Sequence, residues 1–238
     1  MHNYISNAEL EELGESIVLD YTGGKAAWME RIDLEGLIMN YLGLLIEYER
    51  FAEDDLSKIG FLADGTTPLY IYRDGKKTPE IFCKGTIVLD RFLLRTEETG
   101  RRRFTLAHEA AHWLLEKHNP IQASFRSEYD TEQMYSMKEL RQFCNMMESQ
   151  ADRLAAVILM PGCMVREMLP KYAGADRIRV YGRSVFARSE KIAMQRVAEH
   201  MGVSWSALFY RLKELNLLEY RDIQEYLSGE LKLGGDTF

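Results

Sequence analysis

The stretch RRRFTLAHEAAHWLLEKH, residues 101–118, constrains this chain more than any other part of it. His108 and His112 are four residues apart, so on a helix both imidazoles share one face and can bind the same metal ion. Glu109 lies beside that face, where its carboxylate can act on a water molecule at the metal. Most other side chains of the stretch are apolar, which predicts a largely buried helix whose polar groups line a cleft. Buried imidazoles and carboxylates are costly unless paired or bound to a metal, so the pattern favours a metal site.

A second helix, predicted over residues 136–160, supplies the third ligand that such a site requires. Glu148 and Asp152 are four residues apart on one face, among small apolar residues that suit close contact with another helix. Glu148 completes a set of two histidines and one glutamate, which leaves a fourth position open for water, as in catalytic zinc sites. Asp152 is placed to accept the remaining N–H of His108, and this bond would fix the imidazole tautomer.

Simpler interpretations of both helices exist. His108 and His112 could lie on the solvent face of a surface helix, although such faces more often carry Lys, Arg and Glu. Glu148 and Asp152 could be solvent-facing acids on an amphipathic helix. Because both pairs have spacings that suit one metal ion, their combination favours the metal site.

The residues before the motif predict two helices and a small sheet. Residues 7–21 have amphipathic spacing, and Asp33 is a suitable N-cap for a second helix that ends near Gly43. Asp-Gly pairs at 64–65 and 74–75 mark turns. Segments rich in aromatic and β-branched residues predict the strands of a twisted, mostly antiparallel sheet: residues 44–51, 69–73 and 81–89.

Two segments are predicted to form the rim of the cleft. The strand at residues 85–89 is expected to border it, so that an extended peptide could pair with the edge of this strand through main-chain hydrogen bonds. Residues 121–138 are polar and weakly periodic, which predicts a loop that could overhang the cleft.

Residues 166–196 are the basic part of an acidic chain, with 8 Lys and Arg against 3 Asp and Glu, a local charge of +5. The residues that follow predict a helix-turn-helix, in which one helix ends at Gly202 and Ser204 caps the next. Such a unit could contact DNA or a DNA-binding partner, or pack on the rest of the chain. Its second helix offers only Arg211 and Lys213 as strong phosphate contacts, so packing or protein recognition is favoured over DNA reading. Its core is expected to contain Ala198, Val203, Leu208 and Leu212.

The bulk properties predict a soluble, cytoplasmic protein. The chain has 238 residues, 46% of them hydrophobic, which suffices for one large domain or two small ones. No apolar run is long enough to span a bilayer, and the N-terminus lacks the basic and apolar segments of a signal peptide. The 3 widely spaced cysteines argue against a disulfide framework, and the net charge of −7 argues against a nucleic-acid binder that acts through bulk charge. Residues 219–238 are expected to end in a polar, glycine-containing tail.

Three segments together resemble the ImmA/IrrE family of metallopeptidases: RRRFTLAHEAAHWLL, ESQADRLAAVILMP and VAEHMGVSWSALFYRLKELNLL. The resemblance extends from about Ile32 to Leu218. It implies that His108, His112 and Glu148 bind zinc, that Glu109 is the catalytic acid/base, and that the substrate is a repressor of a mobile element or stress regulon. The chain departs from the family pattern at Ala111, where a glycine is usual, and in a longer stretch between the second histidine and Glu148.

We therefore expect an α+β fold, in which a minimal zincin-like domain is followed by a helix-turn-helix-like helical region. The zincin-like domain would combine a small twisted antiparallel sheet with the active-site helices. The expected boundaries are an N-terminal helical segment at residues 1–31, the metallopeptidase domain at 32–165 and a basic linker with the helix-turn-helix-like region at 166–238.

The expected function is zinc-dependent cleavage of a protein partner, a DNA-binding repressor, without involvement of a membrane. Candidates for stabilising the oxyanion are Tyr172, Tyr181 and Arg183, which follow the site in the basic region. The alternative is a non-catalytic protein that binds a regulator or DNA through its helix-turn-helix-like region and has a structural or vacant metal site.

Overall fold

The computed structural model describes residues 5–55, 57–118 and 137–229. It divides into two compact units. The N-terminal unit comprises Met1–Gly23 and Asp33–Leu159, and the C-terminal unit comprises Gly24–Ile32 and Met160–Phe238. The domain boundaries expected at residues 31/32 and 165/166 remain predictions.

Capping residues define the first helices of the N-terminal unit. Helix α1 spans Asn7–Tyr21, the range predicted from the sequence, and begins with a capping box between Ser6 and Glu9. Asp33 caps α2 (Leu34–Gly36) by accepting a hydrogen bond from the main chain of Gly36, as predicted. The helix then continues as a π-helical turn, η2 (Leu37–Tyr41).

A three-stranded sheet has the order β1-β5-β2. Strand β5 (Thr86–Asp90) pairs in parallel with β1 (Leu45–Glu49) and antiparallel with β2 (Gly60–Leu62). The parallel pair is possible because the long connection through β2 and the next hairpin returns the chain to the same direction. The prediction that residues 85–89 offer a free edge to a peptide is wrong, since β5 is the central strand and both of its edges are paired.

A hairpin extends from this sheet. Strands β3 (Leu69–Arg73) and β4 (Lys76–Glu80) are joined by a tight turn at Asp74 and Gly75, whose φ angles are 50° and 75°. Positive φ at both turn residues matches the twist of the strands and explains the Asp-Gly pair. The hairpin and sheet share a small core of Ala63, Leu69, Ile71, Phe82 and Val88. The strand predicted at 81–89 begins only at Thr86.

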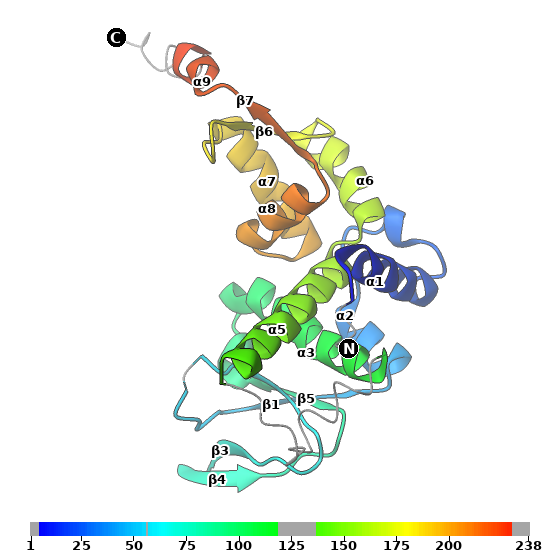
Figure 1. The fold of residues 1–238 in the computed structure, drawn as a ribbon, viewed down its shortest axis with the longest axis vertical. Coiled ribbons are helices and arrows are strands. Elements are labelled where there is room, and N and C mark those ends of the chain that lie inside the picture. The colour runs from blue at the N-terminus through cyan, green and yellow to red at the C-terminus, as the bar shows by residue number, and fades with distance from the viewer. Residues whose placement is uncertain (1–4, 56, 119–136, 230–238) are drawn as a thin grey trace. The chain divides into compact units, whose positions relative to one another are not determined.

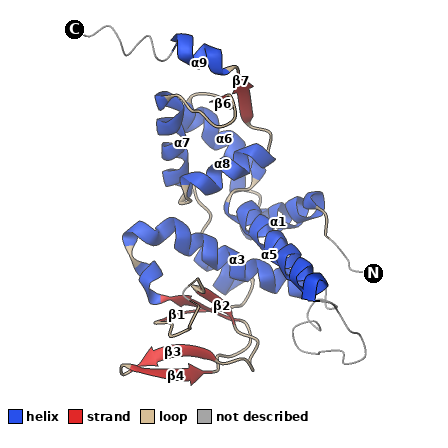
Figure 2. Ribbon diagram, turned by 60° about the vertical axis from the view of Figure 1, so that its left-hand side comes forward, coloured by secondary structure: helices blue, strands red, loops and turns tan. Residues whose placement is uncertain are grey.

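One long helix covers the sheet, and a second long helix packs on the first. Helix α3 (Thr99–His118) packs against β2 and β5 on one side and against α5 (Met137–Leu159) on the other, and α1 packs on α5 (Figures 1 and 2). Two short 3₁₀ turns, η3 (Arg91–Leu94) and η4 (Thr96–Glu98), lead from β5 into α3. The predicted loop at 121–138 lies almost entirely outside the described residues. Both motif-bearing helices are therefore held between a sheet and a third helix.

The C-terminal unit contains the predicted helix-turn-helix. Helix α7 (Arg188–Met201) ends at Gly202, whose φ is 67°, and Ser204 caps α8 (Trp205–Glu214) through the main chain of Ala207. All four predicted core residues are buried, which confirms this part of the prediction: Ala198, Val203, Leu208 and Leu212.

Other elements of this unit were not expected. Helix α6 (Gly162–Ala173) precedes a parallel pair formed by β6 (Ile178–Tyr181) and β7 (Leu218–Arg221), and α9 (Ile223–Gly229) follows. Residues 219–229 thus belong largely to β7 and α9, and the tail predicted at the end of residues 219–238 lies outside the described residues.

An N-terminal segment with the short 3₁₀ turn η1 (Ala26–Trp28) also belongs to this unit. The Glu30 carboxylate lies 2.5 Å from Lys171 Nζ and 3.1 Å from His200 Nδ1, and it accepts a hydrogen bond from the Tyr172 hydroxyl. The hydrogen bonds from Lys171 and Tyr172 lower the pKa of Glu30 to about 2. Arg31 donates to two main-chain carbonyls in the last turn of α7. These bonds attach the segment to α6 and α7.

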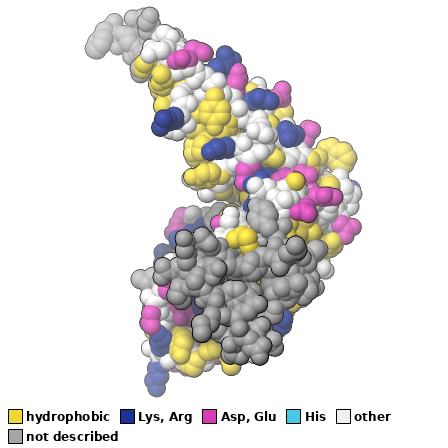
Figure 3. All heavy atoms as spheres, viewed as in Figure 1, with side chains coloured by type: hydrophobic (Ala, Val, Ile, Leu, Met, Phe, Trp, Pro, Cys, Tyr) yellow, Lys and Arg dark blue, Asp and Glu magenta, His cyan; other side chains and the backbone are white. Residues whose placement is uncertain are grey.

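The second helix of the helix-turn-helix does not present its arginine to solvent. Arg211 is only 1% exposed, and its Nε donates to the main-chain carbonyl of Met160 at 2.8 Å. On the face of the C-terminal unit shown in Figure 3, Lys and Arg side chains are interspersed with acidic and hydrophobic ones. Of the two phosphate contacts expected from the sequence, only Lys213 is exposed.

Replacement of Arg211 by Ala is expected to lower the free energy of unfolding by about 2–4 kcal/mol, because it removes a buried side chain and leaves a buried carbonyl unsatisfied. Replacement of the exposed neighbour Lys213 by Ala should change it by less than about 0.5 kcal/mol. Urea denaturation of both variants measures the difference. Equal effects would show that Arg211 is a surface residue.

The fold is α+β, as predicted. Within the described parts of the chain, no helix is both long and apolar enough to cross a membrane.

Candidate metal centre

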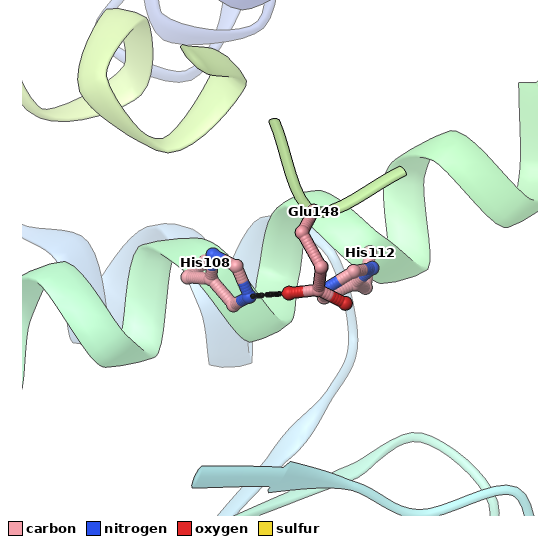
Figure 4. A group of neighbouring side chains, drawn as sticks. All are labelled: His108, His112 and Glu148. Atoms are coloured by element: carbon pink, nitrogen blue, oxygen red, sulfur yellow. Dashed lines mark hydrogen bonds and ion pairs between the residues drawn. The ribbon is translucent and has the colours of Figure 1, made fainter. Parts of the chain in front are cut away.

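The packing of α3 on α5 brings the three predicted ligands together. His108 and His112 project from the same face of α3, and Glu148 on α5 points between them (Figure 4). Helix α3 is closely packed around the two histidines, since Ala107, Ala110 and Ala111 are fully buried. His112 is only 7% exposed, whereas the Glu148 side chain lies at the open side of the cluster.

The distances between the donor atoms suit a single metal ion. His108 Nε2 lies 3.0 Å from His112 Nε2 and 3.2 Å from Glu148 Oε2, and His112 Nε2 lies 3.5 Å from Glu148 Oε1. A tetrahedral ion with ligands at about 2.0–2.1 Å places those ligands roughly 3.3 Å apart. The three observed separations lie on both sides of that value. Each imidazole faces a different oxygen of Glu148, and one ligand atom from each of the three residues lies within 4.8 Å of the other two. The cluster is therefore compact enough to surround one metal ion.

The carboxylate of Asp152 faces the other nitrogen of the His108 ring. Its Oδ1 is 2.9 Å from His108 Nδ1. An Nδ1–H group that donates to this carboxylate leaves the lone pair of His108 on Nε2, which faces His112 and Glu148. This tautomer is the one in which His108 Nε2 could bind a metal ion.

The electrostatics of the cluster favour a cation. Burial of the ring opposes protonation of His108, but hydrogen bonds to Asp152 and Glu148 outweigh burial and raise the pKa of His108 to about 10. Hydrogen bonds from His108 and His112 hold the pKa of Glu148 well below its usual range. The two carboxylates thus stabilise a positive charge beside the imidazoles. A metal ion bound to the Nε2 atoms of His108 and His112 would provide that charge.

Glu109 follows His108 on α3 and lies against the backbone of β2. A Cβ atom added at Gly60 would be 2.6 Å from Glu109 Oε1 and 2.6 Å from Thr105 Cγ2. Gly60 was not among the residues predicted to contribute to the site. No local signal was available, because the short strand that contains Gly60 was not predicted.

The three candidates for stabilising the oxyanion all belong to the C-terminal unit. The Tyr172 hydroxyl donates to Glu30, and the buried ring of Tyr181 lies 5.4 Å from that of Tyr226. Arg183 is exposed. Their assignment to the oxyanion remains a prediction.

Residues 39–213, which include all the candidate site residues, match the family model of the IrrE N-terminal-like domain, Peptidase_M78. The match covers more than half of the chain. The chain belongs to this family. The family resemblance inferred from the motifs is therefore confirmed, and the IrrE N-terminal-like match supports a metallopeptidase-like domain.

Two other comparisons with known proteins do not extend this family assignment. A search of curated proteins gave no match. A solved structure of a Mycobacterium tuberculosis transcriptional regulator is similar at a TM-score of 0.45 and 15% identity, over 89% of this chain and 47% of that chain. The chain thus spans about half the length of that regulator.

Proposed function

We propose that this chain is a zinc-dependent endopeptidase, in which His108, His112 and Glu148 bind zinc and Glu109 is the catalytic acid/base. The observation that carries the proposal is the set of donor separations of 3.0, 3.2 and 3.5 Å among the three ligands. Imidazole nitrogens and a carboxylate are suitable zinc donors. Three protein ligands leave a fourth position open, which is the arrangement of catalytic rather than structural zinc sites.

Each residue of the centre has a defined role in the proposed reaction. Bound zinc supplies Lewis acidity for the scissile carbonyl and lowers the pKa of water. Glu109 accepts the proton of the attacking water on a carboxylate oxygen and transfers it to the leaving amine nitrogen. Asp152 holds the imidazole of His108 through Nδ1, so that Nε2 keeps its orientation.

The proposed substrate segment is an extended peptide that pairs with β2. This strand lies at one end of the order β1-β5-β2 and, among the described residues, pairs with β5 alone. It also packs on α3 beside Glu109. An extended peptide added to its outer edge through main-chain hydrogen bonds would run past the metal centre. We thus assign to β2 the pairing with an extended peptide that was predicted for residues 85–89.

The proposed partner is a DNA-binding repressor of a mobile element or stress regulon, and the proposed location is the cytoplasm, where such a repressor acts. The family resemblance supports this choice. We assign the helix-turn-helix-like region to packing or to recognition of the protein partner, because the buried Arg211 cannot reach a phosphate from its position. Direct DNA binding is the less favoured role.

Elemental analysis of the chain purified without chelator tests the proposed function. About one zinc per chain is expected. A chain that contains no zinc and takes none up when zinc is added would rule out the proposed enzyme and favour the non-catalytic alternative.

Replacement of Asp152 by Asn should weaken zinc binding by roughly 10–100-fold, because the amide no longer stabilises the Nδ1–H of His108 as a carboxylate does. Competition with a zinc chelator measures the affinity. Asp54→Asn is the matched control, since Asp54 is almost fully exposed and bonds to Lys77. Equal affinities for the two variants would contradict the role of Asp152.

A further inference from the structure

Gly60 makes the closest approach of the sheet to the catalytic part of α3. A Cβ atom at this position would lie 2.6 Å from Glu109 Oε1, 3.2 Å from Glu109 Cγ and 2.6 Å from Thr105 Cγ2. Contacts of 2.6 Å are too short for a carbon atom, so any side chain at residue 60 would force a neighbour to move. The φ angle of Gly60 lies outside the left-handed region, so the backbone conformation itself does not require glycine.

The surroundings determine which group would move. Strand β2 is held by β5, in which Leu89 pairs with Gly60 and the Asp90 N–H donates to the Ile59 carbonyl at 2.9 Å. Thr105 is 8% exposed, and its hydroxyl donates to the main-chain carbonyl of Arg101 at 3.0 Å, which fixes its rotamer. The Glu109 carboxylate is the far end of a longer side chain. It is therefore the group that would move most readily, whereas the contact with Thr105 Cγ2 would remain and strain the packing of β2 on α3.

We propose that Gly60 is a positioning residue, whose missing side chain provides the space that holds the Glu109 carboxylate at the metal centre. This inference rests on the proposed function, because it assigns to Gly60 an effect on the acid/base of that reaction. Gly60 itself contributes no group to the reaction in this assignment. It acts through Glu109.

A double-mutant cycle tests the contact between residue 60 and Glu109. It uses chelator-treated protein, so the result depends neither on activity nor on a bound metal. The proteins are the wild type, Gly60→Ala, Glu109→Ala and the double variant. Gly60→Ala should lower the melting temperature by roughly 5 °C when Glu109 is present, and by about half as much in the Glu109→Ala background. Gly229→Ala is the matched control, because a Cβ at Gly229 meets no atom of the described residues within 4 Å, and it should shift the melting temperature by less than about 2 °C.

The visible absorption spectrum of the cobalt(II)-loaded protein tests the effect at the metal. Gly60→Ala should bind as much cobalt as the wild type but show a spectrum displaced towards that of Glu109→Ala. Gly229→Ala should reproduce the wild-type spectrum. A role of Gly60 in folding alone would leave the cobalt spectrum of the folded variant unchanged.

Three results would overturn the inference. They are an equal loss of melting temperature in both backgrounds, a wild-type cobalt spectrum in Gly60→Ala, and a loss of cobalt stoichiometry in that variant, which would place its effect on the ligands instead. A wild-type chain that binds no cobalt would overturn the proposed function. The double-mutant cycle would then still decide whether Gly60 positions Glu109.

Discussion

Glu109→Gln is expected to retain zinc and to reduce proteolysis by roughly 10²–10⁴-fold, the usual contribution of a general acid/base. The amide has nearly the shape of the carboxylate, so the space beside Gly60 remains filled in the same way. It cannot accept the proton of the attacking water. Labelling of new protein N-termini in cells that produce either the wild type or the variant measures the loss and identifies the cleaved bond.

Glu116→Gln is the matched control for this experiment. Glu116 lies on the same helix and faces Lys84, with 3.6 Å between the charged groups. Its replacement should leave the cleavage pattern unchanged, because surface ion pairs contribute little to stability. Full cleavage by Glu109→Gln would refute the proposed mechanism even if zinc is bound.

The second large effect is expected for the metal ligands. His112→Ala and Glu148→Ala should each weaken zinc binding by more than about 100-fold, which exceeds the usual cost of losing an outer hydrogen-bond partner. Each variant leaves two donors of the three, so zinc exchanges a protein ligand for water. Zinc content after gel filtration and affinity by chelator competition measure the loss, and circular dichroism confirms that the variants are folded.

His200→Ala provides the histidine control, since His200 lies on α7 and bonds to Glu30 rather than to a predicted ligand. It should keep one zinc per chain. Full zinc content in either ligand variant would mean that the metal is bound elsewhere.

Local signals account for the elements that the sequence predicted well. Ser6 and Glu9 form a capping box, and the predicted range of α1 is confirmed because such a box depends only on residues three apart. The turn at Asp74–Gly75 could be predicted for the same reason, because it depends on two adjacent residues. The short strand β2 and the polar strand β4, with Pro79, were missed, because their pairing depends on partners elsewhere in the chain.

The features of the candidate site also fall into two groups, those that a local sequence pattern predicts and those that depend on packing. A spacing of four residues places His108 and His112 on one face of any helix, and the same spacing relates Glu148 to Asp152. That the two faces meet could be inferred only from the chemistry they would share. The closeness of Gly60 to Glu109 depends on how a sheet packs on a helix, so no local pattern contains it. The burial of Arg211 could not be predicted from the sequence either, since an isolated arginine is expected at the surface.

The attachment of residues 24–32 to α6 and α7 affects how this protein can be divided. The chain leaves the N-terminal unit at Gly24, returns at Asp33 and leaves again after Leu159, so no single cut separates the two units into whole fragments. A fragment that ended at residue 159 would carry a segment whose Glu30 and Arg31 had lost the groups they bind. Recombination that replaced one unit by a homologous unit would therefore need three matched junctions. The two units are consequently expected to be inherited together.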